Sequence, residues 1–98
     1  MKYNILFSPS ALSDLKEVKR YYHQVSERLS ERFTYYFDDR ISRLQITPLA
    51  GPIRFGRVRC TKLYKFPYLL YYEVNEISRE IIILRILHGR QKPIWEGL

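Results

Sequence analysis

The chain has 98 residues, 46% of them hydrophobic and 28% charged, and its formal net charge is +7. This length supports one modest core, so we expect a single domain over residues 1–98. The lone Cys60 excludes an internal disulfide, and no apolar run approaches the roughly 18 residues of a membrane span. The N-terminal apolar run is too short for a signal peptide, so we expect a cytoplasmic protein with no membrane partner.

The first residues predict a strand followed by a helix. Tyr3–Phe7 is rich in strand formers. Ser8 and Pro9 favour a helix start, because serine caps the first turn and proline fits the first helical position. Apolar residues then recur every three or four positions, which predicts an amphipathic helix. The expected buried stripe consists of Ala11, Leu12, Leu15, Val18, Tyr22 and Val25.

A second helix is predicted between Ser26, a plausible cap, and Pro48, which ends it. The connection to the first helix is short, so the two should form an antiparallel hairpin. The buried stripe of the second helix is expected to contain Leu29, Phe33, Phe37, Ile41 and Leu44.

The second half predicts strands. Gly51-Pro52 is a turn, and residues 53–66 form one or two strands. Leu69–Val74 and Glu80–His88 are strong strand signals, and the latter is apolar on both faces, which favours a central position. Regular alternation along it would place His88 on one face with Ile82, Leu84 and Ile86, and Arg85 on the other. Helices grouped beside three or four later strands indicate an α+β fold.

Most of the positive charge lies after residue 50. Residues 1–50 carry eight Lys or Arg and six Asp or Glu (net +2), whereas residues 51–98 carry nine and four (net +5). Basic residues interleaved with tyrosines are typical of a surface that binds RNA phosphates and stacks bases. The same patch could instead receive an acidic protein, or simply solubilise the sheet. The residues concerned are Arg54, Arg57, Arg59, Lys62, Lys65, Arg85, Arg90 and Lys92, with Tyr64, Tyr68, Tyr71 and Tyr72.

The sequence carries no recognisable metal or cofactor motif. His23 and His88 are far apart and near no cysteine pair, so we expect no metal and no cofactor. His88 has two interpretations: an imidazole held by the backbone at a strand end, or a general acid or base beside Arg90 and Lys92.

Several segments, taken in order, resemble the RelE/ParE superfamily of bacterial toxins. They are Ser8–Ala11 leading into Asp14-Leu15, Tyr21-Tyr22, Pro48 with Gly51, Arg59, Phe66–Tyr72 and Ile83–Gln91. The resemblance implies a two-helix hairpin packed on a twisted, mainly antiparallel sheet of four or five strands. It also implies the toxin of a type II toxin–antitoxin (plasmid-stabilisation) module, neutralised by a cognate antitoxin. We expect that antitoxin to carry an acidic, amphipathic segment covering the helix hairpin or the basic sheet face.

Two activities are known in this superfamily. RelE-like members are metal-independent, ribosome-dependent mRNA endonucleases, and Lys62, His88 and Arg90 match catalytic positions of that branch. ParE-like members poison DNA gyrase. Ribosome-dependent members commonly carry an arginine at the position occupied here by Leu69, and the segment Leu84–Arg90 looks more like the ParE branch. Gyrase poisoning is therefore our main hypothesis, with the endonuclease as the alternative and a non-toxic nucleic-acid-binding module as the third.

The resemblance and the charge pattern together suggest residues that contact the target. Trp95 either covers an edge of the core or stacks near the active face. The oligomeric state stays open between a homodimer and a toxin–antitoxin hetero-oligomer. The candidate target-binding residues are Arg57, Arg59, Lys65, Arg85, Lys92 and Trp95.

Overall fold

The computed structural model describes residues 2–91. Two helices and five strands follow one another along this part of the chain. They are β1 (Asn4–Phe7), α1 (Pro9–Val25), α2 (Glu27–Ile46), β2 (Ile53–Phe55), β3 (Val58–Lys62), β4 (Tyr68–Asn75) and β5 (Glu80–His88). The predicted segment 53–66 therefore contains two strands, and the predicted strand at Glu80–His88 has the observed bounds.

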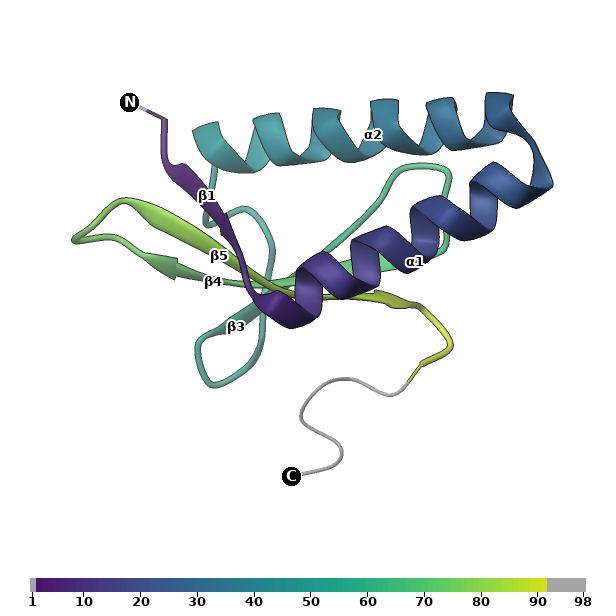
Figure 1. The fold of residues 1–98 in the computed structure, drawn as a ribbon. Coiled ribbons are helices and arrows are strands. Elements are labelled where there is room, and N and C mark those ends of the chain that lie inside the picture. The colour runs from purple at the N-terminus through teal and green to yellow at the C-terminus, as the bar shows by residue number, and fades with distance from the viewer. Residues whose placement is uncertain (1, 92–98) are drawn as a thin grey trace.

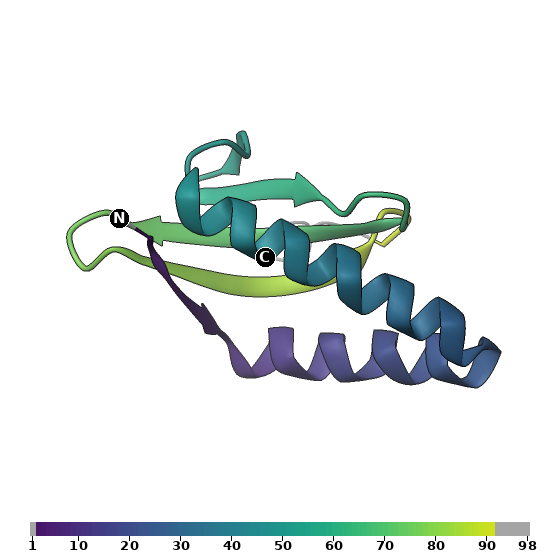
Figure 2. The same ribbon diagram turned by 90° about the horizontal axis from the view of Figure 1, so that it is seen from above.

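The strands form one sheet in the order β1-β5-β4-β3-β2. β1 runs parallel to β5, and the other neighbouring strands are antiparallel. The two helices lie on the same side of this sheet (Figure 1). Seen from above, α2 runs obliquely over the strands and α1 runs alongside the edge of the sheet (Figure 2). The predicted α+β fold is confirmed, and β5 is an interior strand between β1 and β4.

Two serines set the helix boundaries, as the sequence predicts. The Ser8 hydroxyl accepts a hydrogen bond from the Ala11 N–H at 3.0 Å and donates one to the Leu84 carbonyl at 2.8 Å. Ser26 ends α1 through its own N–H and caps α2 by accepting from the Leu29 N–H at 3.0 Å. A single residue thus separates the helices, which forces the antiparallel hairpin.

The core lies between the hairpin and the sheet, and aromatic rings fill much of it. Phe33 and Phe37 of α2 are buried against the sheet, as the stripe of α2 predicts. The expected stripe of α1 is partly wrong, because Leu12 and Val25 are 46% and 57% exposed. Leu12 adjoins the fully buried Ala11, and Val25 is the last residue of α1.

β5 contains an irregularity that changes which side chains share a face. Tyr71 pairs with Arg85 but Tyr72 pairs with Ile83, so one extra residue is inserted in β5. Consequently Ile81, Ile83 and Ile86 all enter the helix-side core, whereas Leu84 packs with the cluster on the other face. The regular alternation expected from the sequence, which grouped His88 with Ile82 and Leu84, is wrong because a bulge reverses the parity.

Candidate target-binding surfaces

The C-terminal end of β5 is held by α1 rather than by a neighbouring strand. β1 pairs with β5 only as far as Ile83. Beyond that point, the Asp14 carboxylate accepts the Ile86 backbone N–H at 2.9 Å and binds Arg85 through two hydrogen bonds, at 2.7 and 3.0 Å. The Asp14 side chain is only 12% exposed, and its carboxylate raises the pKa of Arg85. Arg85, predicted to contact the target, is therefore engaged within the fold.

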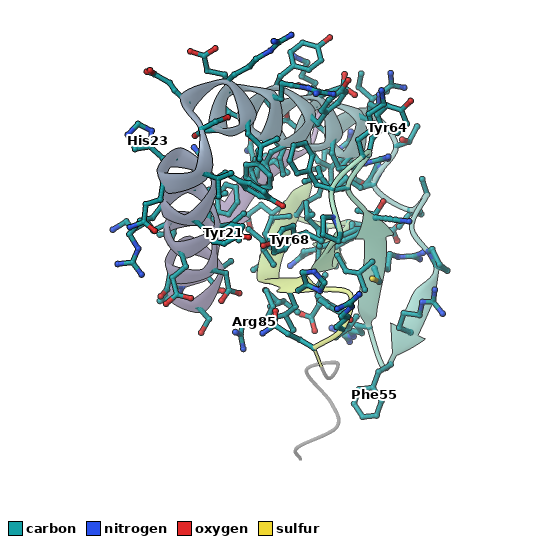
Figure 3. All side chains as sticks on the ribbon, turned by 90° about the vertical axis from the view of Figure 1, so that its right-hand side faces the viewer. Tyr21, His23, Phe55, Tyr64, Tyr68 and Arg85 are labelled. Atoms are coloured by element: carbon teal, nitrogen blue, oxygen red, sulfur yellow. The ribbon has the colours of Figure 1, made fainter. Side chains whose placement is uncertain are left out.

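His88 lies at the same strand end, on the helix side of the sheet. Its ring meets that of Tyr68, its cross-strand partner, at 5.4 Å. Nδ1 accepts the Arg90 backbone N–H at 3.1 Å, so in the neutral imidazole the proton sits on Nε2. A cleft of about 220 Å³ between α1 and the sheet is lined by His88, Tyr68, Tyr21 and Glu17 among others. Figure 3 shows Tyr21 and Tyr68 beside one another at this cleft.

Lys62 and His88 lie at the same end of the sheet but on opposite faces. Lys62 pairs with Leu69, which packs against the cluster containing Val58 and Cys60 on the face away from the helices. Tyr68, which pairs with His88, belongs instead to the helix-side core. Leu69 is half-buried and apolar, so it offers no cation between them. The three residues matching nuclease positions thus do not converge: Arg90 follows His88, and Lys62 faces the other way.

Arg59 is used to hold a loop. Its guanidinium donates to the carbonyls of Leu49 and Gly51 at 3.1 and 2.8 Å. The buried Tyr72 hydroxyl donates to the Pro48 carbonyl at 2.9 Å and accepts the Gly51 N–H at 3.0 Å. Burial raises the pKa of Tyr72, because the phenolate would be poorly solvated. Together these two side chains fix the segment between α2 and β2.

A groove of about 640 Å³ opens next to this loop, between the β2–β3 turn and the β4–β5 turn. Arg57, exposed in the β2–β3 turn, lines it together with Arg59. Exposed Leu49, Ile53 and Ile77 supply apolar surface. Phe55 projects from the same end of the molecule (Figure 3). Two carboxylates, Glu73 and Glu76, also line the groove and balance the two arginines. A groove that combines apolar groups with charges of both signs suits a protein partner.

The expected tyrosine stacking surface on the sheet is not formed. Tyr71 and Tyr72 are buried, and Tyr68 packs into the helix-side core. Only Tyr64 of the four is exposed, in the loop before β4. Its neighbour Lys65 is also exposed, with its ammonium 5.5 Å from the Tyr64 ring centroid. Tyr68 and Tyr72 pack on the helix side of the sheet, and Tyr71 packs in the cluster on the other face.

Two predicted site residues lie outside the part of the chain that the structure describes, and three further candidates were not predicted from the sequence. Lys92 and Trp95 lie outside the described residues. Residues 2–91 contain no cluster of metal-ligating side chains. No helix among them is long and apolar enough to cross a membrane. The functional candidates missed from the sequence are Arg40, Tyr35 and Tyr36 on α2, whose only signal was their alternation of ring and cation along one helix.

Comparison with known proteins agrees with this architecture. Residues 5–93 match the family model described as ParE toxin of type II toxin–antitoxin system, parDE. No curated protein matches the chain. Among solved structures, the chromosomal ParDE system of P. aeruginosa superposes with a TM-score of 0.72 at 22% identity, covering 89% of this chain and 96% of that one.

Two RelE-type structures share the fold. The toxin–antitoxin complex RelBE2 of Mycobacterium tuberculosis has a TM-score of 0.61 at 22% identity, covering 90% of this chain and 99% of that one. A mutant of the E. coli toxin RelE in the free state has a TM-score of 0.61 at 17% identity, covering 92% and 86% of the two chains.

Proposed function

The chain belongs to the ParE toxin family of type II toxin–antitoxin systems, and from that premise we propose that it arrests growth by poisoning DNA gyrase. A cognate antitoxin is its partner, in keeping with the toxin–antitoxin systems among its structural relatives. The finer choice of target rests on the arrangement of the residues that a nuclease would need.

The separation of Lys62 from His88 is the observation that carries the proposal. Cleavage of RNA through its 2′-hydroxyl needs a base, an acid and a cation around one phosphate. Here Lys62 and His88 face opposite sides of the sheet. With Nδ1 occupied by the Arg90 N–H, the Nε2–H of the neutral His88 ring can donate a hydrogen bond but offers no free lone pair to act as a base. This geometry favours a binding toxin over an RNA-cleaving enzyme.

We assign the direct contact with the target to Arg57 and the groove that it lines. Arg57 is exposed, whereas the guanidinium groups of Arg59 and Arg85 already bind partners within the fold. Arg59 and Arg85 would then contribute by positioning the loop and the strand end. Lys65 contributes positive charge from the loop before β4.

The antitoxin would mask the same groove. An acidic, amphipathic segment could place carboxylates against Arg57 and apolar side chains against Leu49, Ile53 and Ile77. A structure of the complex tests this arrangement. Contacts from the antitoxin that reach neither this groove nor the helix hairpin would contradict it.

Induced expression without antitoxin tests the function. The proposal expects growth arrest with double-strand DNA breaks, while primer extension shows intact mRNA. Fresh cuts at regular positions within codons would instead support the endonuclease. Normal growth would contradict both gyrase poisoning and mRNA cleavage and would support a non-toxic binding module.

Two sets of variants sharpen that test. Arg57→Glu should reduce growth inhibition several-fold, because it reverses a charge at the proposed contact. Arg28→Glu, an equally exposed charge reversal on α2, serves as the control and should retain inhibition. His88→Ala and Arg90→Ala should also remain toxic. Loss of toxicity in these last two variants, with their fold intact, would favour nuclease chemistry.

A further inference from the structure

A second pocket lies between α2 and the loop formed by residues 63–67, apart from the groove at Arg57. Its volume is about 370 Å³. The loop side is marked by Tyr64, which Figure 3 shows beside α2. The residues lining it are Tyr35, Tyr36, Asp39, Arg40, Arg43 and Tyr64. The proposed action on gyrase makes no use of this pocket.

The loop presents Tyr64 and Lys65 from a fixed backbone. Leu63 and Phe66 are buried on either side of Tyr64 and Lys65, and the Leu63 N–H donates to the Tyr68 carbonyl at 3.0 Å. Lys65 has a φ of 64°, a left-handed conformation that costs a non-glycine residue about 1 kcal/mol or more. The surrounding structure therefore imposes this conformation, which holds the Lys65 ammonium 5.5 Å from the Tyr64 ring centroid.

Three phenol rings adjoin one another around the pocket. Tyr36 is half-buried, and its ring centroid lies 5.2 Å from that of Tyr35 and 5.3 Å from that of Tyr64. The two outer residues are 67% and 58% exposed, respectively. Two largely exposed rings thus flank a third that is held in place by packing.

The cations around these rings are only partly neutralised. Arg43 pairs with Asp39 at 2.9 Å. The Nε of Arg40 is buried and finds no hydrogen-bond partner among residues 2–91. The Nε of Arg40 therefore does not use the Asp39 carboxylate, which binds Arg43. Arg40, Arg43 and Lys65 together exceed the single carboxylate of Asp39 by two charges.

We propose that this pocket binds a segment of single-stranded nucleic acid, with a base stacked on Tyr64 or Tyr35 and its phosphate beside Arg40 and Lys65. Each nucleotide supplies a flat ring and an anion together, which matches the exposed rings and the arginines of the pocket, with Lys65 beside its Tyr64 wall. An acidic peptide would match the cations but leave the rings without a specific partner. The observations therefore favour the nucleic acid.

Fluorescence anisotropy with a labelled hexathymidylate or hexauridylate and the full-length chain tests the proposal. Tyr64→Ala should weaken binding by about tenfold, as the loss of one stacked base predicts, and Tyr64→Phe should bind like the parent chain. Lys65→Gln should make the logarithm of the binding constant fall less steeply with the logarithm of salt concentration. The change in slope should correspond to the loss of nearly one phosphate contact. Arg40→Gln should also weaken binding.

Arg57→Gln removes one charge at the distant groove and is the matched control for Lys65→Gln. It should leave the anisotropy titration nearly unchanged. Equal losses in Arg57→Gln and Lys65→Gln would mean general electrostatic attraction and would overturn the site. Unchanged binding in Tyr64→Ala, or displacement of the oligonucleotide by a short Glu-rich peptide at a lower concentration than unlabelled oligonucleotide, would overturn it as well. These binding measurements are independent of any effect on gyrase.

Discussion

At the scale of single residues, Gly51 and Tyr72 show how closely the connection after α2 is fitted to the sheet. A Cβ on Gly51 would lie 2.5 Å from the Tyr72 hydroxyl and 2.8 Å from the Cys60 carbonyl. The Tyr72 hydroxyl donates a hydrogen bond to the Pro48 carbonyl and accepts one from the Gly51 N–H. No side chain other than hydrogen fits there without moving the buried tyrosine.

Gly51→Ala should therefore destabilise the fold by about 2–4 kcal/mol, through overpacking and loss of buried hydrogen bonds. Gly89→Ala is the control, because its added Cβ would lie 3.7 Å from its nearest neighbour, the Pro67 carbonyl oxygen. That change should stay within about 0.5 kcal/mol. Urea unfolding of both variants measures the difference, and similar losses would contradict the packing described here.

Tyr22 predicts a loss of stability at alkaline pH. Burial, together with the neighbouring Tyr68 hydroxyl, raises the pKa of Tyr22 to about 12 from an ordinary value near 10. The folded state thus holds the proton more tightly than the unfolded state, and the contribution is complete below pH 10. Between about pH 10 and 12 the unfolded chain loses its proton first, so stability falls as pH rises, by roughly 2 kcal/mol.

Tyr22→Phe should flatten this part of the stability profile, measured by urea unfolding at a series of pH values. Tyr21→Phe changes a neighbouring exposed ring that is the smallest contributor to the raised pKa of Tyr22, so it should alter the profile much less. An unchanged alkaline slope in Tyr22→Phe would show that the burial of this hydroxyl is not its source.

At the scale of elements, α1 completes the sheet where β1 stops. Asp14→Asn should destabilise the chain by about 2–3 kcal/mol, because Arg85 and the Ile86 N–H both lose a charged acceptor. Asp39→Asn breaks an exposed ion pair on α2 and should cost less than about 1 kcal/mol. Hydrogen exchange should quicken at the end of β5 in the first variant only. Equal exchange in both would refute the role of Asp14.

Much of this fold can be predicted from local signals in the sequence. Ser8 and Ser26 set helix ends through bonds to residues three positions away, and such short-range contacts can be predicted from spacing. The bulge in β5 could not be predicted in this way, because it depends on the register with β4. As a result, the sequence pattern placed Leu84 on the same face as His88, whereas Leu84 packs on the opposite face.

The candidate sites depend on contacts between residues far apart in the chain, and spacing does not reveal these. Asp14 and Arg85 are separated by 71 positions, so the charge pattern presented Arg85 as a free cation. Tyr72 was expected on a binding surface, but the fold uses its hydroxyl to fix a loop. Arg57 is exposed, so its positive charge keeps it a candidate for contact with the target.

At the scale of the whole molecule, two separate surfaces are candidates for binding. One is the groove near Arg57, with apolar residues around it, and the other is the pocket of rings and cations on α2. Lys62 and His88 lie on opposite faces of the sheet. This arrangement supports our proposal of a toxin that binds its target.

The most direct measurement mixes the purified chain with purified gyrase, ATP and relaxed plasmid, and traps cleaved DNA with detergent and protease. Our account predicts that supercoiling stops and linear plasmid accumulates, with less accumulation for Arg57→Glu than for Arg28→Glu. Unaffected supercoiling, together with mRNA cut by the same preparation on ribosomes, would contradict it.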